Sequence, residues 1–393
     1  MKQALTAALS IVIATSMSAA QYTLVELEPL PGGRESLATG IDAQGRIVGT
    51  SRSAGGFRMA VVWPSSDQSP VALGLLDGGL ESDGVAILDG LAIGIGDRPC
   101  GQRGAFAWSA ADGLQAFGPD TCSATEALGV NASGDALLLL GTPSFPVIWP
   151  VDDGTPRFLE TWDQPASVFH IDDAGRVVGA SAFHPEGGGI TRAVQWNADG
   201  TTLLLPRIDS SASGPDVALH RNDQGLIVGQ ARSDGKSRAV IWNGADEPID
   251  AGTLLGVEVS SSLISINGTG QAVGSSSLGA ITWDADEGTR LLRDLIDASV
   301  DGWTLSAAQD INDAGQIVGN GISPRGDVRG FALLTGGGAC TADLDGDGSL
   351  SIFDFLAFQN LFDSGDTRAD FDGDGSLTIF DFLAFQNAFD AGC

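Results

Sequence analysis

Short apolar runs bounded by Gly, Asp and Asn recur through the middle of the chain, with the spacing of strands rather than helices. The clearest unit has Asn or Asp, two variable residues, Gly, and an apolar stretch that a second Gly usually closes, as in Asp42 to Gly49. Seven copies follow one another, on average 45 residues apart, with turn glycines at Gly45, Gly90, Gly134, Gly175, Gly225, Gly270 and Gly315. This period predicts an array of similar structural units.

Each repeat is expected to contain four strands. A short apolar strand enters the turn, where Asn or Asp tolerates turn geometry and Gly accepts a positive φ, and a second strand leaves it as the other arm of a hairpin. A third strand ends at Phe331 in the seventh copy and at Trp in the others, namely Trp63, Trp108, Trp149, Trp196, Trp242 and Trp283. With a fourth strand after the next turn, the pattern predicts a mainly β fold, a seven-bladed β-propeller over 21–339, and leaves an open β-solenoid as the alternative.

The two ends of the array predict how the ring closes. The seventh copy stops after its third strand, at Phe331 to Leu334, whereas the stretch from Tyr22 to Leu27 is an extra strand before the first copy. If this strand completes the last blade, two open sheet edges disappear at once. The sequence therefore predicts a closure of three strands plus one.

The repeats resemble a known extracellular family. The stretch from Asp310 to Gly319, followed by Gly330-Phe331-Ala332, is similar to the HAF repeats of bacterial extracellular proteins. The resemblance spans nearly the whole array, although the second and third copies are degenerate. It implies an extracellular repeat protein, and a residue that recurs in every blade is expected to serve the blade rather than one site.

Charge and targeting signals narrow the classes of partner. The chain has 20 Lys and Arg against 50 Asp and Glu, a net charge of -30, which argues against nucleic acid and anionic membrane surfaces as partners. Residues 1–20 have a positive start, an apolar run and small residues at 18–20, which predicts a signal peptide cleaved before Gln21. Since no later run is long enough to span a bilayer, we expect a secreted protein without a transmembrane segment, extracellular or attached to the cell surface.

The cysteines are expected to form two disulfides. Cys100, Cys122, Cys340 and Cys393 are even in number, and an exported protein permits oxidation. In a four-stranded blade, the loops that carry Cys100 and Cys122 emerge on the same face, so these two are predicted to pair. Cys340 and Cys393 bracket the C-terminal segment and form the second predicted pair.

Candidate ligand-binding residues lie where the repeats differ. Two positions before the turn Asn or Asp, the innermost strands carry His170, His220 and Asp310, which we expect to converge on the central channel; buried structural residues between blades are the alternative. The second copy has Val85 at the equivalent place. The loop of 182–189, with His184, is a second candidate, and its face is the first place where we expect a ligand.

Catalysis is the less favoured hypothesis. Propellers include glycoside hydrolases and polysaccharide lyases, and the many carboxylates leave room for a catalytic pair acting on carbohydrate. However, the sequence has no Gly-x-Ser-x-Gly elbow, phosphate-binding loop or His-rich metal motif. We therefore expect a non-catalytic recognition surface, with a polysaccharide-active enzyme as the alternative.

Residues 340–393 contain a duplicated calcium-loop motif. Ca²⁺ prefers six to eight oxygen ligands, and the 12-residue loops starting at Asp343 and Asp370 supply oxygens at positions 1, 3, 5, 7, 9 and 12. A solvated acidic turn is the alternative, but two full copies favour two bound calcium ions. The predicted ligands are Asp343, Asp345, Asp347, Ser349, Ser351 and Asp354 in the first loop and Asp370, Asp372, Asp374, Ser376, Thr378 and Asp381 in the second.

The tandem loops resemble a type I dockerin. Asp rather than Glu at position 12, the duplication, and the ending Gly392-Cys393 are similar to GC-type dockerin-like, EF-hand-related modules over 340–393. The resemblance implies attachment to a cohesin-like or other cell-surface protein. Loop positions 10 and 11, often Ser-Thr in dockerins, are Ile-Phe here, and apolar residues follow on each helix. Candidate partner-binding residues are Ile352, Phe353, Phe358, Ile379, Phe380 and Phe385, with a shared Phe-rich core as the alternative and Phe355, Leu356 and Phe362 as the expected core stripe.

Overall fold

The computed structural model divides into two compact units, Tyr22–Gly337 and a second one that includes Gly338–Cys393, and we describe each by itself. The predicted signal peptide lies outside the described residues. The structure describes residues 21–119, 124–141, 144–152, 155–159, 166–183, 190–244, 246–254, 257–335, 342, 344, 351–371 and 376–391.

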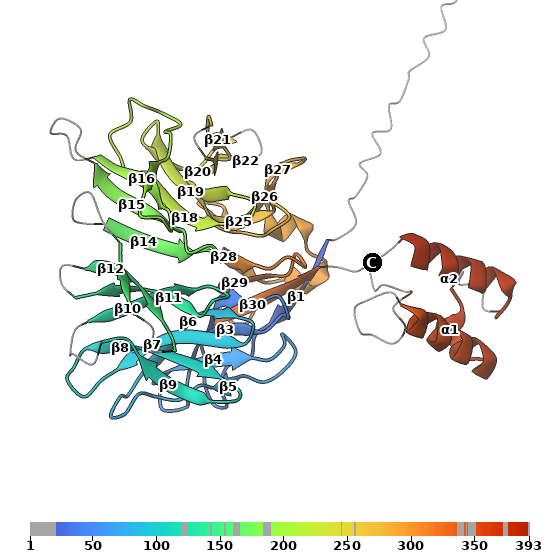
Figure 1. Cartoon of the computed structure of the whole chain (residues 1–393). Coiled ribbons are helices and arrows are strands. Elements are labelled where there is room, and N and C mark those ends of the chain that lie inside the picture. Colours follow the sequence, from blue (N-terminus) through green and yellow to red (C-terminus); the bar gives the residue numbers. More distant parts are fainter. Residues whose placement is uncertain are drawn as a thin grey trace, which may run out of the picture. The chain divides into compact units, whose positions relative to one another are not determined.

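The larger unit consists of seven four-stranded antiparallel sheets (Figure 1). In chain order, the first three blades are β2 (Ser36–Ile41), β3 (Ile47–Arg52), β4 (Arg58–Trp63) and β5 (Val71–Ala72); β6 (Ser82–Leu88), β7 (Leu91–Asp97), β8 (Arg103–Ser109) and β9 (Gly113–Phe117); and β10 (Thr125–Val130), β11 (Asp135–Leu140), β12 (Phe145–Pro150) and β13 (Arg157–Phe158).

The next three blades follow the same order. They are β14 (Ala166–Ile171), β15 (Val177–Phe183), β16 (Ile190–Trp196) and β17 (Thr202–Leu204); β18 (Val217–Arg221), β19 (Leu226–Ser233), β20 (Lys236–Asn243) and β21 (Ile249–Asp250); and β24 (Ser261–Ile266), β25 (Ala272–Ser276), β26 (Gly279–Asp284) and β27 (Gly288–Leu291). The connections add the small hairpin β22 (Thr253–Leu254) and β23 (Val257–Glu258) and the 3-10 turns η1 (Leu292–Leu295) and η2 (Ala298–Val300).

Blade 7 closes the ring with strands from both ends of the unit. It contains β28 (Thr304–Ile311), β29 (Ile317–Ile322), β30 (Val328–Thr335) and, outermost, β1 (Tyr22–Glu26). Tyr22 lies opposite Thr335 and Glu26 opposite Phe331 in the antiparallel register. The innermost strands contact one another in sequence, and β28 contacts β2. The predicted seven-bladed propeller and its closure of three strands plus one are therefore confirmed.

The hydrophobic core is divided into layers between neighbouring blades. Each of the seven junctions has its own buried apolar cluster. Trp63, fully buried, packs with Leu27 and Val318 between blades 1 and 7, and its indole N–H donates to the Glu28 carbonyl at 2.9 Å. Because each sheet buries its faces only against its neighbours, no blade has a core of its own.

A β-bulge in each innermost strand explains the second Gly of the repeat. The register shifts between Ala38 and Gly40 in β2, and at the equivalent place in the other six innermost strands. The backbone comes so close there that a Cβ on Gly49 would lie 1.9 Å from the Leu37 carbonyl oxygen. The closing glycine allows this close approach rather than a turn in six blades, whereas blade 3 has Leu138 at the equivalent position.

In six of the seven repeats, the Asn or Asp of the turn links neighbouring blades. Asn267 is 4% exposed; its side-chain oxygen accepts the N–H of Gln271 at 2.9 Å, and its Nδ2 donates to the Asn312 carbonyl of blade 7 at 3.0 Å. Asn312 in turn donates to the Asp42 carbonyl of blade 1 at 3.0 Å. Asn131 and Asn222 make the same kind of bond to blades 4 and 6.

In the degenerate second repeat, the structure assigns a different residue to the position of His170 and His220 than the sequence predicted. Its hairpin closes over Asp89 and Gly90, both with positive φ, so the turn is one residue shorter than in the other copies. Ala86 rather than Val85 therefore takes the place of His170 and His220, and Val85 is the bulge residue.

The described part of the second unit is a pair of helices, α1 (Ile352–Ser364) and α2 (Ile379–Ala391), with the 3-10 turn η3 (Thr367–Ala369) between them. Phe358 and Phe385 are 3% and 1% exposed, and their rings stack with centroids 4.5 Å apart. The assignment of these two residues to a partner surface is therefore wrong. Phe355 and Leu356, expected in the core, are 39% and 45% exposed, although the Phe355 ring lies 5.9 Å from that of Phe382 and 6.2 Å from that of Phe385. None of the described helices is both long and apolar enough to cross a bilayer.

Cys100 is disulfide-bonded. Cys122, Cys340 and Cys393 lie outside the described residues, so both predicted pairings stay predictions. We expect non-reducing peptide mapping to recover Cys100 joined to Cys122. A peptide joining Cys100 to Cys340 or Cys393 would contradict the independence of the two units.

Replacing Asn267 by Ala tests the link between blades. The change leaves a buried carbonyl and a backbone N–H without their partners, so we expect a loss of roughly 2–4 kcal/mol in the free energy of unfolding, measured by urea denaturation. The control is Asn243→Ala, at an exposed position of β20, which should change stability by less than about 0.5 kcal/mol. Equal effects of the two substitutions would rule out a special role for the turn amide.

Candidate functional site

A cavity of the propeller lies at the end of the central channel near the repeat turns. Its volume is about 420 Å³, and all seven innermost strands contribute to its walls. Turn residues such as Asp42, Ala43 and Asp173 form its rim. The cavity thus opens on the face of the Asn-x-x-Gly turns, whereas the sequence led us to expect a ligand on the opposite face.

Two layers of side chains line this channel below the rim. The deeper layer consists of the bulge residues, which are apolar in five successive blades and polar in blades 1 and 7: Thr39, Val85, Leu128, Phe169, Leu219, Ile264 and Gln309. The layer nearer the rim follows each bulge by one residue and consists of Gly40, Ala86, Gly129, His170, His220, Ser265 and Asp310.

His170 and His220 meet in the upper layer, as the sequence predicted. They come from β14 and β18 of adjacent blades, and their ring centroids are 3.7 Å apart. The Nδ1 atom of each ring is buried without a hydrogen-bond partner among the described residues. An unpartnered acceptor costs less than an unpartnered N–H, so the neutral form with its proton on Nε2 fits this site best.

Burial keeps both imidazoles neutral. It lowers the pKa of His170 to about 4, with a further contribution from the positive charge of Arg221. Burial also lowers the pKa of His220 well below its usual value, and the neighbouring His170 adds to this shift. Two uncharged rings therefore face the channel at neutral pH.

Asp310 lines the same channel but has a structural role. Its carboxylate accepts the Ser265 hydroxyl at 2.7 Å, the Ile41 N–H at 2.9 Å and the Ile311 N–H at 2.9 Å. Burial raises the pKa of Asp310, and these hydrogen bonds oppose that shift. The side chain thus joins blades 6, 7 and 1, which matches the structural alternative for this residue rather than a shared site with the histidines.

Small residues leave the space that makes up much of the cavity. Blades 1 to 3 place Gly40, Ala86 and Gly129 in the upper layer, where blades 4 and 5 have imidazoles. A Cβ built on Gly129 would have only Ile171 within 4 Å, at 3.8 Å from its Cγ2 atom. The cavity is therefore open on the side of blades 1 to 3, because their residues in this layer have a methyl group or no side chain.

The rim of the channel is acidic. Arg46 pairs with Asp42 at 2.6 Å, and Arg176 and Arg221 pair with Asp172 at 2.7 and 2.6 Å, so these arginines are neutralised by turn carboxylates. Three further carboxylates of the rim are exposed and take part in no ion pair among the described residues, namely Asp173, Asp223 and Asp313.

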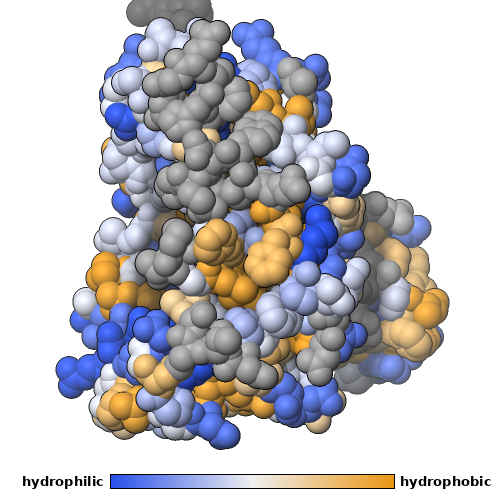
Figure 2. All heavy atoms as spheres, turned by 60° about the vertical axis from the view of Figure 1, so that its left-hand side comes forward, coloured by the Kyte–Doolittle hydropathy of each residue, from blue (hydrophilic) through white to orange (hydrophobic). Residues whose placement is uncertain are grey.

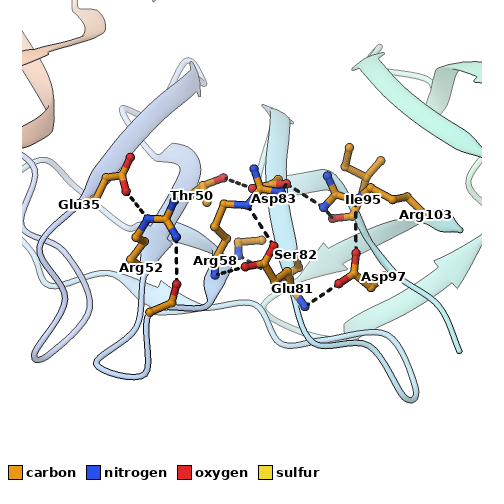
Figure 3. A network of polar contacts seen from close by, with 12 residues as sticks. Glu35, Thr50, Arg52, Arg58, Glu81, Ser82, Asp83, Ile95, Asp97 and Arg103 are labelled. Atoms are coloured by element: carbon orange, nitrogen blue, oxygen red, sulfur yellow. Dashed lines mark hydrogen bonds and ion pairs between the residues drawn. The ribbon is translucent and has the colours of Figure 1, made fainter. Parts of the chain in front are cut away.

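The beginning of the innermost strand β6 also carries charged contacts. Between blades 1 and 2, Asp83 accepts the Thr50 hydroxyl at 3.1 Å and lies 3.3 Å from Arg58 and 2.7 Å from Arg103 (Figure 3). These side chains are partly exposed, so their net contribution to stability is small.

On the face drawn in Figure 2, apolar side chains gather near the centre of the view among hydrophilic ones. His184, the remaining candidate of the propeller, lies outside the described residues.

The last residues of the two calcium loops make matching contacts. Asp354 and Asp381 are fully buried. Asp354 accepts the N–H of Leu344 at 2.9 Å and of Ser351 at 2.8 Å, at loop positions 2 and 9. Asp381 accepts the N–H of Phe371 at 2.9 Å and of Thr378 at 2.6 Å, at the same positions.

The remaining predicted calcium ligands divide between described and masked parts of the loops. Ser351 and Thr378 begin the two helices, and each side-chain oxygen accepts a backbone N–H two residues later at 3.1 Å. Asp370 and Ser376 are described as well. Outside the described residues lie Asp343, Asp345, Asp347, Ser349, Asp372 and Asp374.

The first turns of the two helices expose matching apolar pairs. Ile352 and Phe353 are 64% and 62% exposed, and Ile379 and Phe380 are both 63% exposed. The four candidates for partner binding at loop positions 10 and 11 are therefore on the surface of their unit, unlike Phe358 and Phe385.

Comparisons with known proteins support the fold alone. No family model matches the chain, and neither does any curated protein. Among solved structures, YCF48 bound to D1 peptide aligns with 81% of this chain and 98% of its own, at 9% identity and a TM-score of 0.52. A puromycin-hydrolyzing peptidase of Mycobacterium tuberculosis aligns with 78% of this chain at 13% identity and a TM-score of 0.55. TolB from Acinetobacter baumannii aligns with 55% of it at 12% identity and a TM-score of 0.37. The alignments span 52% of the peptidase and 57% of TolB.

The histidine pair predicts a pH-dependent stability. Since the unfolded chain takes up these protons near pH 6.5 and folded His170 only near pH 4, the unfolded state binds more protons in this window. Stability should therefore fall as the pH is lowered from 6.5 toward 4, by roughly 3 kcal/mol for His170. The raised pKa of Asp310 acts in the opposite direction, with stability lost as the pH rises.

Urea denaturation across this pH range checks the expectation. The variant His170→Asn/His220→Asn should have a flatter pH profile than the parent, because it lacks the two buried imidazoles. Asp310 is unchanged in both, so it does not contribute to the difference. Parallel profiles would contradict the assignment of neutral, buried imidazoles.

Proposed function

We propose that this is a secreted, non-catalytic recognition protein whose propeller binds a ligand and whose C-terminal segment attaches it to an extracellular or cell-surface protein in a calcium-dependent way. In this proposal the HAF-like propeller presents the recognition surface. The dockerin-like segment, 340–393, provides the attachment. A cohesin-like protein is the proposed kind of partner.

The chemistry of the channel carries the non-catalytic part of the proposal. An acid–base mechanism needs titratable groups with free proton positions close to a substrate. Asp310 uses its carboxylate in three hydrogen bonds within the blades, and the imidazoles of His170 and His220 are neutral and lie against each other with their planes tilted by 36°. These features suit a wall that contacts a ligand better than a pair that transfers protons.

The matching contacts of Asp354 and Asp381 support the calcium loops. Each buried carboxylate draws the beginning and the end of its loop together through two backbone N–H donors. A carboxylate oxygen has two lone-pair positions, so a carboxylate that accepts hydrogen bonds can also bind a cation. In the proposal, Ca²⁺ is held in the first loop by Asp343, Asp345, Asp347, the Ser349 carbonyl, Ser351 through water and Asp354, and in the second by their six counterparts.

The exposed apolar pairs support attachment through the first turns of the helices. Ile352-Phe353 and Ile379-Phe380 each follow a loop directly, so a bound ion would fix their position. Large apolar side chains that are more than 60% exposed in a small unit are typical of interaction surfaces.

Calcium titration of the full chain tests the proposed sites. Asp345→Asn and Asp372→Asn each remove a ligand charge from one loop, so each should weaken one of two calcium-binding events at least tenfold by calorimetry. Asp363→Asn, an exposed carboxylate of α1 outside the loops, is the matched control and should leave both events unchanged. Chelation should lower the thermal stability of the helical signal and leave the β-sheet transition in place.

The attachment step needs a separate test. The full chain, used as bait in the secreted and envelope fractions of the producing cell, should capture a protein in calcium but not in chelator. Phe353→Ser/Phe380→Ser should abolish this capture while both calcium-binding events remain. Capture that persists in chelator or in this variant would contradict the proposal.

A further inference from the structure

The central channel has a graded chemistry from its mouth inward. Each innermost strand runs toward its turn, so the order from the mouth is the acidic rim, then the histidine layer, then the apolar bulge layer. The rim contributes Asp173, Asp223 and Asp313, and the apolar layer includes Phe169, which is 36% exposed.

We propose that this channel binds a basic polypeptide segment of a partner protein, with one apolar side chain inserted to the bulge layer and flanking Lys or Arg residues on the acidic rim. The inference rests on the proposed recognition role of the propeller and names the chemistry of its ligand. It follows from the cavity, its apolar floor and the charge of its mouth taken together.

Charge complementarity selects a cationic ligand. The arginines at the mouth already have carboxylate partners at Asp42 and Asp172, with distances of 2.6 to 2.7 Å. The backbone N–H groups of Ala132 and Gly268 hold Asp173 and Asp313 in place at 2.8 and 2.6 Å, so these carboxylates are positioned in advance. The net charge of -30 favours the approach of a cation and disfavours that of an anion.

The depth of the channel and its apolar bulge layer favour an apolar side chain as the part of the ligand that enters the channel. Val85, Leu128, Phe169, Leu219 and Ile264 form a continuous apolar arc over five blades. The imidazoles above the arc are neutral at physiological pH, so a cation at the rim meets no positive charge from them. A cavity of about 420 Å³ is large enough for a Leu or Phe side chain with its flanking backbone at the mouth.

A polypeptide fits better than a free amine because the carboxylates of the rim and the apolar bulge layer lie at different depths of the channel. A single small amine cannot place positive charge at three carboxylates spread over blades 4, 5 and 7 and also fill the bulge layer. A segment with cations on both sides of an apolar residue can do both at once.

Binding of a labelled pentapeptide to the full chain tests the proposal. The probe is acetylated and amidated Lys-Lys-Phe-Lys-Lys, measured by fluorescence polarisation at low and physiological salt. We expect saturable binding that weakens with salt, at least tenfold weaker binding of Lys-Lys-Ser-Lys-Lys, and none of Glu-Glu-Phe-Glu-Glu. Equal binding of the three peptides, or binding of none, would overturn the proposal.

Two variants locate the binding in the channel. Gly129→Leu fills the cavity where a side chain has room, and we expect it to weaken binding of the Phe peptide at least tenfold. Asp223→Asn/Asp313→Asn keeps the acceptor for the Gly268 N–H, and it should weaken binding several-fold and reduce the dependence on salt. Asp301→Asn, an exposed carboxylate outside the channel, is the control and should have no effect.

The remaining outcomes are also decisive. Unchanged binding by Gly129→Leu would place the peptide elsewhere and contradict the proposal. Spermidine that competes as well as the unlabelled peptide would assign the rim to free polyamines instead. The calcium-dependent capture uses other residues, so a chain that captures its partner but binds no basic peptide would refute this inference alone.

Discussion

The structure depends on the buried Asn or Asp that opens the first hairpin in six of the seven blades. Asn131, Asn222, Asn267 and Asn312 each close their own turn through the side-chain oxygen and donate through Nδ2 to the backbone carbonyl at the equivalent turn of the next blade. Each blade buries its apolar faces against neighbouring blades, so a single blade cannot bury a core alone. These bonds fix the register between sheets while the apolar clusters supply most of the free energy.

Where the turn has Asp instead of Asn, an ion pair takes the place of the amide hydrogen bond. These ion pairs contribute to the chemistry of the channel. Asp172 has no amide to donate, so Arg221 of the next blade donates to its carboxylate at 2.6 Å and to the Asn222 carbonyl at 2.8 Å. The positive charge of Arg221 also helps to lower the pKa of His170. At Asp42, Arg46 and the Gly90 N–H play the corresponding parts. The blade junctions and the candidate site are thus built from the same residues.

The periodicity of the sequence was sufficient to predict the blades and their closure, because turn glycines, strand lengths and the extra strand at Tyr22–Glu26 are local signals. The meeting of His170 and His220 followed from their shared position in the repeat. Asp310 shares that position too, yet its contacts depend on Ser265 and Ile41 of neighbouring blades, which the repeat pattern does not reveal. The bulge layer was missed because a bulge changes which residues face the channel without leaving a mark in the hydrophobic pattern. In the helices, Phe355 and Phe358 look alike in sequence, and only the packing of α1 on α2 decides which one is buried.

Native-state hydrogen exchange of the propeller tests the central claim, that strand β1 and the turn amides make the seven blades one cooperative ring. We predict that amides of β1, β30 and the inner hairpins of all seven blades exchange with the same free energy, equal to that of global unfolding. If blade 7 opened at a much lower free energy than blades 2 to 6, the ring would behave as an open stack of sheets, and the account would be contradicted.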